Sequence, residues 1–109
     1  MKYHIPVLAP EILEYFNPQK GQIFLDATLG NGGHSLEILK RGATVWGLEA
    51  DPVNLKIAVG RINDEGLTQN FHPLLGNFSH LTAIWKKNIN LPLDGLLADL
   101  GLSLNQQSG

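Results

Sequence analysis

The sequence predicts an α/β fold built around a parallel sheet, and three observations lead to this prediction. Short apolar segments typical of buried strands alternate with segments in which apolar residues recur every three to four positions. A glycine-rich turn follows the first strand and opens a helix. The 109 residues, 43% of them hydrophobic and with a net charge of -2, suit one soluble globular domain. Regular alternation of strand and helix implies right-handed crossovers, with helices on both faces of the sheet.

The first half of the chain is expected to contain two helices and two strands. Pro18 ends the first helix, and Gly42 is a typical C-cap for the second. The expected elements are, in order, a helix over residues 9–16, a strand over 23–26, a glycine-rich turn over 29–33, a helix that carries Leu36 and Leu39, and a strand over 44–49.

The second half repeats the alternation. Asp51 followed by Pro52 is a typical N-cap and first helical residue. Gly60 costs about 1 kcal/mol in a helix relative to Ala, so we expect it to pack tightly against a neighbour. Pro73 favours a strand at the edge of the sheet. The expected elements are a helix in which Leu55, Ala58, Val59 and Ile62 recur on one face, a strand over 71–75, a helix capped by Ser79 with Leu81, Ile84 and Trp85 on one face, and an apolar strand over 94–100.

These elements predict an incomplete Rossmann-like doubly wound sheet with strand order 3-2-1-4. In such sheets ligands bind in the crevice outside the carboxyl ends of the strands, where the strand order reverses between strands 1 and 4. Ligand groups should therefore gather among the residues that end the strands. These are Asp26 and the glycines after strand 1, Glu49 after strand 2, Asn77 and Phe78 after strand 3, and Asp99 after strand 4.

The glycines and Glu49 suggest a nucleoside site. Gly30, Gly32 and Gly33 lie where a backbone can approach a ligand closely, and we expect a larger side chain at Gly32 to fill ligand space. Glu49 follows the first glycine by 19 residues, close to the spacing of a carboxylate that binds two ribose hydroxyls. The alternative for the glycines is that the turn needs them only for their positive φ angles. The alternative for Glu49 is that its charge simply faces solvent at the end of the strand. Ser35 replaces the third glycine of the dinucleotide fingerprint, which disfavours a nicotinamide or flavin ligand.

Four other residues are candidates. Asp99 ends an apolar strand, where an unpaired carboxylate would be costly, so a ligand or a backbone donor should meet it. Asp26 is similar, or else it braces the glycine loop. Phe78 could lie against an adenine ring or be a core aromatic. His34 could contact a ligand or simply begin a helix. Asp51 is interpreted as a helix cap.

Composition excludes several kinds of function. Cysteine is absent, which excludes disulfides and thiolate metal sites, and no pair of the four histidines has metal-binding spacing. We therefore expect no metal. The chain has no basic patch large enough to hold a nucleic acid by phosphate contacts alone. No segment is apolar and long enough to cross a membrane, and the N-terminus lacks a secretory signal, so we expect a cytoplasmic protein.

Five motifs together resemble the bacterial ribosomal RNA small subunit methyltransferase H family. They are HIPVL over residues 4–8, DATLGNGGHS over 26–35, Asp51-Pro52, GNF over 76–78 and DGLLADLG over 94–101. The similarity extends over nearly the whole chain. It implies that residues 1–109 are the N-terminal part of a class I S-adenosylmethionine-dependent methyltransferase domain, which transfers a methyl group to N4 of a cytidine in 16S ribosomal RNA. The implied partner is 16S rRNA or the small ribosomal subunit.

The resemblance also implies a set of site residues. Those implied to bind S-adenosylmethionine are Gly32, Gly33, His34, Glu49, Phe78, Asp99 and Gln106. Asp99 and Ser103 are the candidates for holding the amino group of the target base. Glu49 stands where the family usually has Asp, and the sequence after Gly101 departs from the usual V-S-S-P-Q.

Family members continue well beyond the fourth strand, so the cofactor-binding half is the part expected here. Two other functions stay open: a non-catalytic fragment that binds a nucleoside or S-adenosylmethionine, and a nicotinamide dinucleotide-binding domain. We also expect self-association through the edge of strand 4, because no Pro, Lys or bulge protects residues 95–100.

Overall fold

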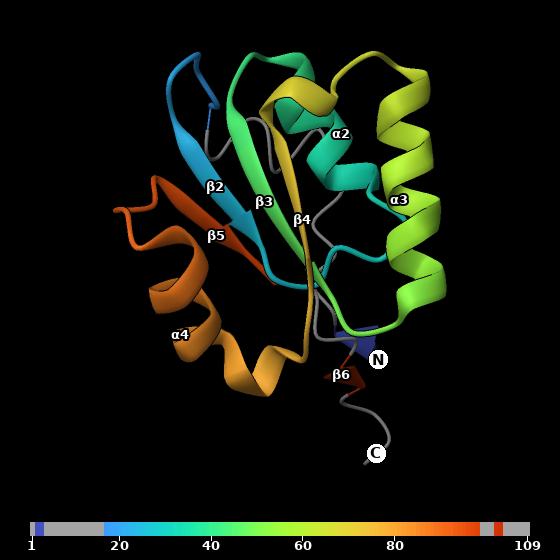
Figure 1. The fold of residues 1–109 in the computed structure, drawn as a ribbon, viewed down its shortest axis with the longest axis vertical. Helices are drawn as coiled ribbons and strands as arrows, with labels where there is room; N and C mark the ends of the chain where they lie inside the picture. The colour runs from blue at the N-terminus through green and yellow to red at the C-terminus, as the bar shows by residue number, and fades with distance from the viewer. Residues whose placement is uncertain (1, 4–16, 99–101, 104–109) are drawn as a thin grey trace.

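The computed structural model describes residues 2–3, 17–98 and 102–103, and its centre is a four-stranded parallel sheet (Figure 1). Its helices and longer strands are β2 (Ile23–Asp26), α2 (Gly33–Lys40), β3 (Thr44–Glu49), α3 (Pro52–Asp64), β4 (Phe71–Leu75), α4 (Leu81–Ile84) and β5 (Gly95–Leu97). Two short strands, β1 (Lys2–Tyr3) and β6 (Leu102–Ser103), pair antiparallel. The helix expected over residues 9–16 lies outside the described residues.

The strand order is β4-β3-β2-β5, which confirms the predicted order 3-2-1-4. All neighbouring strands of this sheet are parallel, so their carboxyl ends meet at one edge. In the last paired position of β2 and β3, Asp26 lies opposite Gly47. Pro73 lies in β4, an edge strand, as its missing N–H predicts. Among the described strands, β5 forms the other edge.

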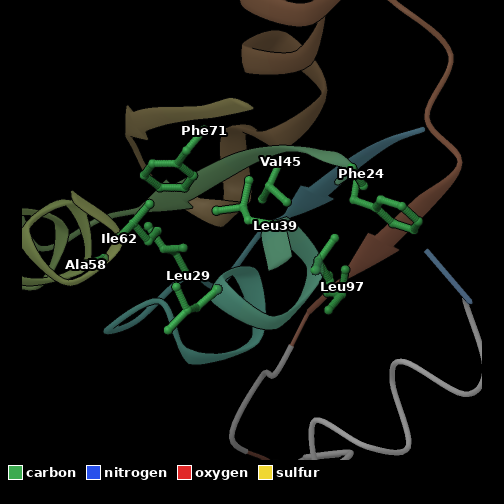
Figure 2. Packing of buried hydrophobic residues seen from close by; sticks show 11 residues of the cluster. Phe24, Leu29, Leu39, Val45, Ala58, Ile62, Phe71 and Leu97 are labelled. Atoms are coloured by element: carbon green, nitrogen blue, oxygen red, sulfur yellow. The ribbon is translucent and has the colours of Figure 1, made fainter. Parts of the chain in front are cut away.

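One face of the sheet is closed by α2 and α3 (Figure 2). Each strand contributes an apolar side chain to this core, and the two helices pack theirs against them. The buried cluster consists of Phe24, Leu29, Leu36, Ile38, Leu39, Ala43, Val45, Ala58, Ile62, Phe71 and Leu97, all at most 6% exposed. The predicted apolar face of α3 is thus confirmed at Ala58 and Ile62, whereas Leu55 and Val59 are only partly buried.

The opposite face of the sheet is covered by α4 and the turns around it, and less completely. Trp46 on β3 stacks on His72 of β4 with ring centroids 4.2 Å apart, and both side chains are half-buried. On β5, Leu96 remains 48% exposed. An apolar groove on this face is lined by Leu25, Leu81, Thr82, Trp85, Leu93 and Leu96.

The ends of the helices show one correct and one wrong prediction. Asp51 caps α3 as predicted, because its carboxylate accepts a hydrogen bond of 2.8 Å from the N–H of Val53. The prediction that Ser79 caps the helix is wrong: α4 has no side-chain cap, and Asn77 caps the 3-10 turn that precedes it. The Asn77 side chain accepts from the N–H of Ser79 at 2.8 Å. The reason is that a 3-10 turn, Phe78–His80, precedes α4, so helical geometry begins earlier than the sequence pattern indicates. A π-helical turn, Trp85–Ile89, then follows α4.

Two further expectations differ from the structure. Gly60 does not pack tightly: it is exposed, and a Cβ added there would have no atom within 4 Å. The face of α3 that carries Gly60 points away from the sheet. The strand predicted over residues 94–100 is shorter, because β5 ends at Leu97 and residues 99–100 lie outside the described part. The carboxylate of Asp94 instead accepts from the N–H of Ile23 at 2.8 Å, which joins the starts of β5 and β2.

Candidate functional site

The carboxyl ends of β2, β3 and β4 border an open pocket of about 190 Å³. Three segments line it, one after each strand. They supply Ala27 and Thr28, then Leu48, Glu49 and Ala50, then Gly76, Asn77 and Phe78. The pocket therefore lies at the carboxyl edge of the sheet, where doubly wound folds bind ligands, and it contains three of the predicted strand-end residues. It borders β2, β3 and β4, and no described residue of β5 lines it, so it is displaced from the predicted reversal point between β2 and β5.

The glycine-rich turn adopts the backbone conformation that requires glycine. Gly30 has φ 58° and Gly32 has φ 84°, both in the left-handed region. Gly32 is the N-cap residue of α2, and a Cβ added to it would lie 3.2 Å from the Cβ of Ala58 on α3. The expectation that a larger side chain at Gly32 fills ligand space stays a prediction, but the structure shows a second constraint on this residue. Such a side chain would press on α3, so Gly32 is required for the packing of α2 on α3.

Glu49 is held by two backbone donors. Its Oε1 accepts from the N–H of Gly30 at 2.8 Å, and its Oε2 accepts from the N–H of Asp51 at 3.0 Å. The side chain is half-buried and lines the pocket, so it is not the solvent-facing charge of the alternative interpretation. A carboxylate has about four lone-pair sites, so both oxygens can accept a further hydrogen bond.

Asp26 and Ser35 form a buried pair beneath the glycine loop. The hydroxyl of Ser35 in α2 donates to Oδ2 of Asp26 at 2.8 Å, and both residues are at most 2% exposed. Burial raises the pKa of Asp26, while the Ser35 hydrogen bond and the nearby His34 act in the opposite direction. This arrangement favours the interpretation of Asp26 as a brace of the loop. Ser35 at the third glycine position is therefore a packing residue with a polar partner.

The remaining predicted residues occupy the rim of the pocket or lie elsewhere. Phe78 is 38% exposed at the rim, so it is not a core aromatic. Gly33 and His34 begin α2, and both are half-buried. Asp99 and Gln106 lie outside the described residues, and Ser103 is described only as part of the backbone of β6.

Two kinds of feature are absent from the described residues. No helix there is long and apolar enough to cross a membrane. Nor does this part of the chain contain a group of three His, Cys, Asp or Glu residues arranged to hold a metal ion.

Comparison with known proteins identifies the family. The model of the MraW methylase family matches residues 1–109, the full length of the sequence. This chain belongs to the MraW methylase family. The match confirms the resemblance that the glycine-rich motif and the DGLLADLG motif indicate.

Curated relatives in this family are considerably longer than the chain. The ribosomal RNA small subunit methyltransferase H of Myxococcus xanthus is 41% identical over 103 residues, covering 94% of this chain and 32% of the relative. The protein of the same name from Deinococcus radiodurans is 39% identical, covering 92% and 30%. A 12S rRNA N(4)-cytidine methyltransferase of Bos taurus is 39% identical, covering 96% and 26%. The chain thus spans about a third of the length of the curated relatives it matches.

Solved structures confirm the Rossmann-like fold of this family member. An rRNA methylase from Streptococcus thermophilus matches with a TM-score of 0.67 and 18% identity, covering 84% of this chain and 54% of that one. An RNA methyltransferase from Salinibacter ruber, solved in complex with S-adenosyl-L-homocysteine, matches with a TM-score of 0.62 and 21% identity, covering 72% and 52%. At these identities the likeness concerns the fold alone.

Sequence reasoning missed how the MraW family chain fixes its site internally. The spacing of Gly30 and Glu49 predicts a shared ligand, and the structure adds a hydrogen bond between these two residues that the spacing does not predict. A hydrogen bond between positions 19 residues apart has no local sequence signal. The sequence pattern predicts Asn77 only as a residue that follows a strand. Its capping role depends on the 3-10 turn, which the pattern does not indicate.

Proposed function

We propose that this chain is the cofactor-binding part of an S-adenosylmethionine-dependent methyltransferase that modifies N4 of a cytidine in 16S ribosomal RNA. One observation carries the proposal: Glu49 lines a pocket at the ends of parallel strands, together with residues 27–28 and Phe78, and its carboxylate is hydrogen-bonded to the glycine loop. We infer that residues 1–109 are the N-terminal part of a class I methyltransferase domain.

The residues of the pocket fit an adenosine group. Glu49 offers two acceptors for the two hydroxyls of an unphosphorylated ribose. Leu48, Ala50 and Phe78 give an apolar wall against which an adenine ring can lie. Gly33 and His34, in the first turn of α2, offer backbone N–H groups that the helix leaves free, and these suit the carboxylate at the methionine end.

The choice of substrate rests on the names of the relatives. The Myxococcus xanthus relative is named for the small ribosomal subunit, and the Bos taurus relative for N4 of cytidine. We therefore propose 16S rRNA, within or outside the small subunit, as the partner and the cytoplasm as the location. The bound cofactor supplies a methyl group already activated by the positively charged sulfur. The work of the chain's own residues is then to orient the ribose through Glu49 and to exclude water at the adenine with Phe78.

Asp99, Ser103 and Gln106 complete this proposal. Gln106 and Asp99 would close the cofactor pocket, and Asp99 or Ser103 would accept a hydrogen bond from the N4 amino group. The nitrogen lone pair of cytosine is delocalised into the ring, so an acceptor at one N–H would help N4 to attack.

Calorimetric titration tests the cofactor part. S-adenosylmethionine and S-adenosylhomocysteine should bind the chain more tightly than NAD. Glu49→Ala should weaken this binding by about 1 to 3 kcal/mol, the scale for losing a charged hydrogen-bond partner. Glu37→Gln, on the surface of α2, is the matched control and should bind as the wild type does. Tighter binding of NAD would replace the proposal by the dinucleotide alternative, and no nucleoside binding at all would remove it.

A chimera tests the transfer reaction. In it, this chain replaces the matching segment of the Myxococcus xanthus relative, and the product is incubated with unmodified small subunits and labelled S-adenosylmethionine. We expect N4-methylcytidine in digests of the 16S rRNA, and less of it with Glu49→Ala. A folded chimera that binds the cofactor and transfers no methyl group would favour the non-catalytic alternative.

Self-association through β5 stays a separate proposal. Its support is the half-exposed Leu96 and an edge strand with no Pro or Lys in Gly95–Leu97. Sedimentation over a concentration series should show dimers or larger species. A monomer at the highest concentration would contradict it.

A further inference from the structure

Glu49, the last residue of β3, forms hydrogen bonds with residues that follow β2, β3 and β4. Its backbone C=O accepts from the N–H of Gly76, after β4, at 2.9 Å. Its side chain accepts from the N–H of Gly30 in the glycine loop at 2.8 Å and from the N–H of Asp51 in the turn before α3 at 3.0 Å. The residue therefore joins the ends of three neighbouring strands.

The Gly30 contact continues the pairing of β2 and β3 beyond the strands. Asp26 and Gly47 are the last paired residues of the two strands. After them the N–H of Leu29 donates to the C=O of Leu48 at 2.9 Å. The next donor along the loop is Gly30, and its acceptor is a side chain instead of a backbone carbonyl. The carboxylate thus supplies the acceptor at the point where the backbone of β3 turns toward β4.

We propose that Glu49 is a positioning residue for the glycine-rich loop, in addition to the ribose acceptor of the proposed function. Its bonds to Gly30 and Asp51 set the distance between the loop and the β3–α3 turn independently of a ligand. The ribose and the methionine end of the cofactor would then enter a site whose width is already fixed, which lowers the ordering cost of binding. Only the ligand-binding part of this inference rests on the proposed function.

The length of the Glu49 side chain is essential to this role. An Asp at this position is shorter by one C–C bond of about 1.5 Å. The two bonds that Glu49 makes are 2.8 and 3.0 Å long, so a carboxylate withdrawn by that amount would exceed hydrogen-bonding distance to at least one donor. Glu49→Asp therefore keeps the negative charge at the pocket and removes the connection, which separates the two roles.

Amide hydrogen exchange tests the connection without any ligand. In Glu49→Asp the amide of Gly30 should exchange about tenfold faster or more, the factor expected for loss of a hydrogen bond to a charged group. Amides in the middle of α2, such as that of Ile38, should be unchanged. Glu49→Gln keeps the length and one acceptor oxygen, so it should keep most of the protection at Gly30. Glu37→Gln is the control for loss of a carboxylate elsewhere. Unchanged exchange at Gly30 in both Glu49→Asp and Glu49→Ala would overturn the proposal.

Comparison of two ligands tests the consequence for binding. Adenosine reaches only the ribose and adenine parts of the site, whereas S-adenosylhomocysteine also reaches the glycine loop. If Glu49 positions the loop, Glu49→Asp should weaken the binding of S-adenosylhomocysteine by a factor several times larger than the factor by which it weakens the binding of adenosine. Equal factors for the two ligands would mean that Glu49 acts on the ribose alone, and would overturn the loop role while leaving the proposed function intact. If the wild type bound neither ligand, the proposed function would fail, and the exchange experiment would still decide the connection.

Discussion

The site has two sides that differ in how firmly the chain holds them. One is the glycine-rich loop, which adjoins the pocket through Glu49 and is called the glycine-rich wall below, and the other is the segment after β4 that lines the pocket. The glycine-rich wall is fixed by the bond of Gly30 to Glu49 and by the buried pair of Ser35 and Asp26 beneath it. The wall after β4 is held by the hydrogen bond from the N–H of Gly76 to the C=O of Glu49. It continues into the exposed residues Asn77 and Phe78, where the Asn77 side chain accepts a hydrogen bond from the nearby N–H of Ser79. We therefore expect substitutions in the glycine-rich wall to lower the free energy of unfolding. Substitutions in the exposed wall should instead lower the affinity for the ligand.

The largest effect is expected at Gly32. Gly32→Val forces a branched residue to φ 84° and brings its Cβ to 3.2 Å from Ala58, so it should lower the free energy of unfolding by about 3 kcal/mol. Gly30→Ala is the matched control, because φ is also positive there but a Cβ would meet nothing within 4 Å. It should cost only about 1 kcal/mol. Urea denaturation measures both. If Gly32→Val kept its stability and lost only ligand binding, the glycine wall would not be the stabilising one.

The buried pair gives the next largest effect. Ser35→Ala leaves the Asp26 carboxyl without its hydroxyl donor, and loss of such a partner in the interior costs about 2 kcal/mol. The same denaturation series measures this loss. Glu37→Gln on the exposed side of α2 should stay within about 0.5 kcal/mol of the wild type. A cost at Ser35 no larger than that of the control would show that the hydroxyl does not stabilise the loop.

The raised pKa of Asp26 predicts a pH effect on stability. The folded chain holds the Asp26 proton at pH values where the unfolded chain, with the ordinary pKa of 3.8, has released it. Asp26 therefore lowers the free energy of unfolding as pH rises from about 3.8 through the raised pKa. Asn has no proton to release at this position. The free energy of unfolding of the wild type should therefore fall relative to that of Asp26→Asn as the pH rises over this range. A constant difference between the two proteins would mean that burial does not raise the pKa of Asp26.

On the exposed wall the effect should appear in binding. Phe78→Ala removes the aromatic side of the pocket and should weaken S-adenosylhomocysteine about tenfold, or about 1.4 kcal/mol, in calorimetric titration. The free energy of unfolding should change by less than about 0.5 kcal/mol, because the ring is 38% exposed. A variant that lost stability but kept its affinity would reverse the assignment of the two walls.

The smallest effect is expected away from both walls. Gly60→Ala places a methyl group in open space on a helix and should raise the free energy of unfolding by up to about 1 kcal/mol. Ligand affinity should not change. Thermal denaturation and titration of the same preparation measure the two quantities. A loss of stability would show that Gly60 packs against something after all.

The sequence predicted the fold better than the contacts within the site. Alternation of strands and helices gave the strand order, and Pro73 marked an edge strand, because these depend on local pattern and general handedness. Asp51 was recognised as a cap because the following Pro52 fixes where the helix begins. Before α4 no such signal exists, and Asn77 and Ser79 are both good capping residues. The bond between Gly30 and Glu49 depends on how two distant segments meet, which no local pattern records.

Whether Gly60 packs or faces water also depended on tertiary structure. The period of α3 predicts an apolar face, but only the contact with the sheet decides that Ala58 and Ile62 are buried while Leu55 and Val59 are partly covered. Likewise, the pairing of β1 with β6 joins residues about a hundred positions apart, and each strand has only two residues. Segments that short carry no periodicity.

Pro73 makes the two edges of this sheet unequal as places where a further strand can pair. A strand laid beside β4 would find no N–H donor at the middle of that strand, whereas β5 presents Gly95–Leu97 without a proline. The edge formed by β5 is therefore the more favourable one for a further strand. The pocket lies at the carboxyl ends of β2, β3 and β4, and none of its described lining residues comes from β5. Material added at the open edge thus leaves the Phe78 wall uncovered.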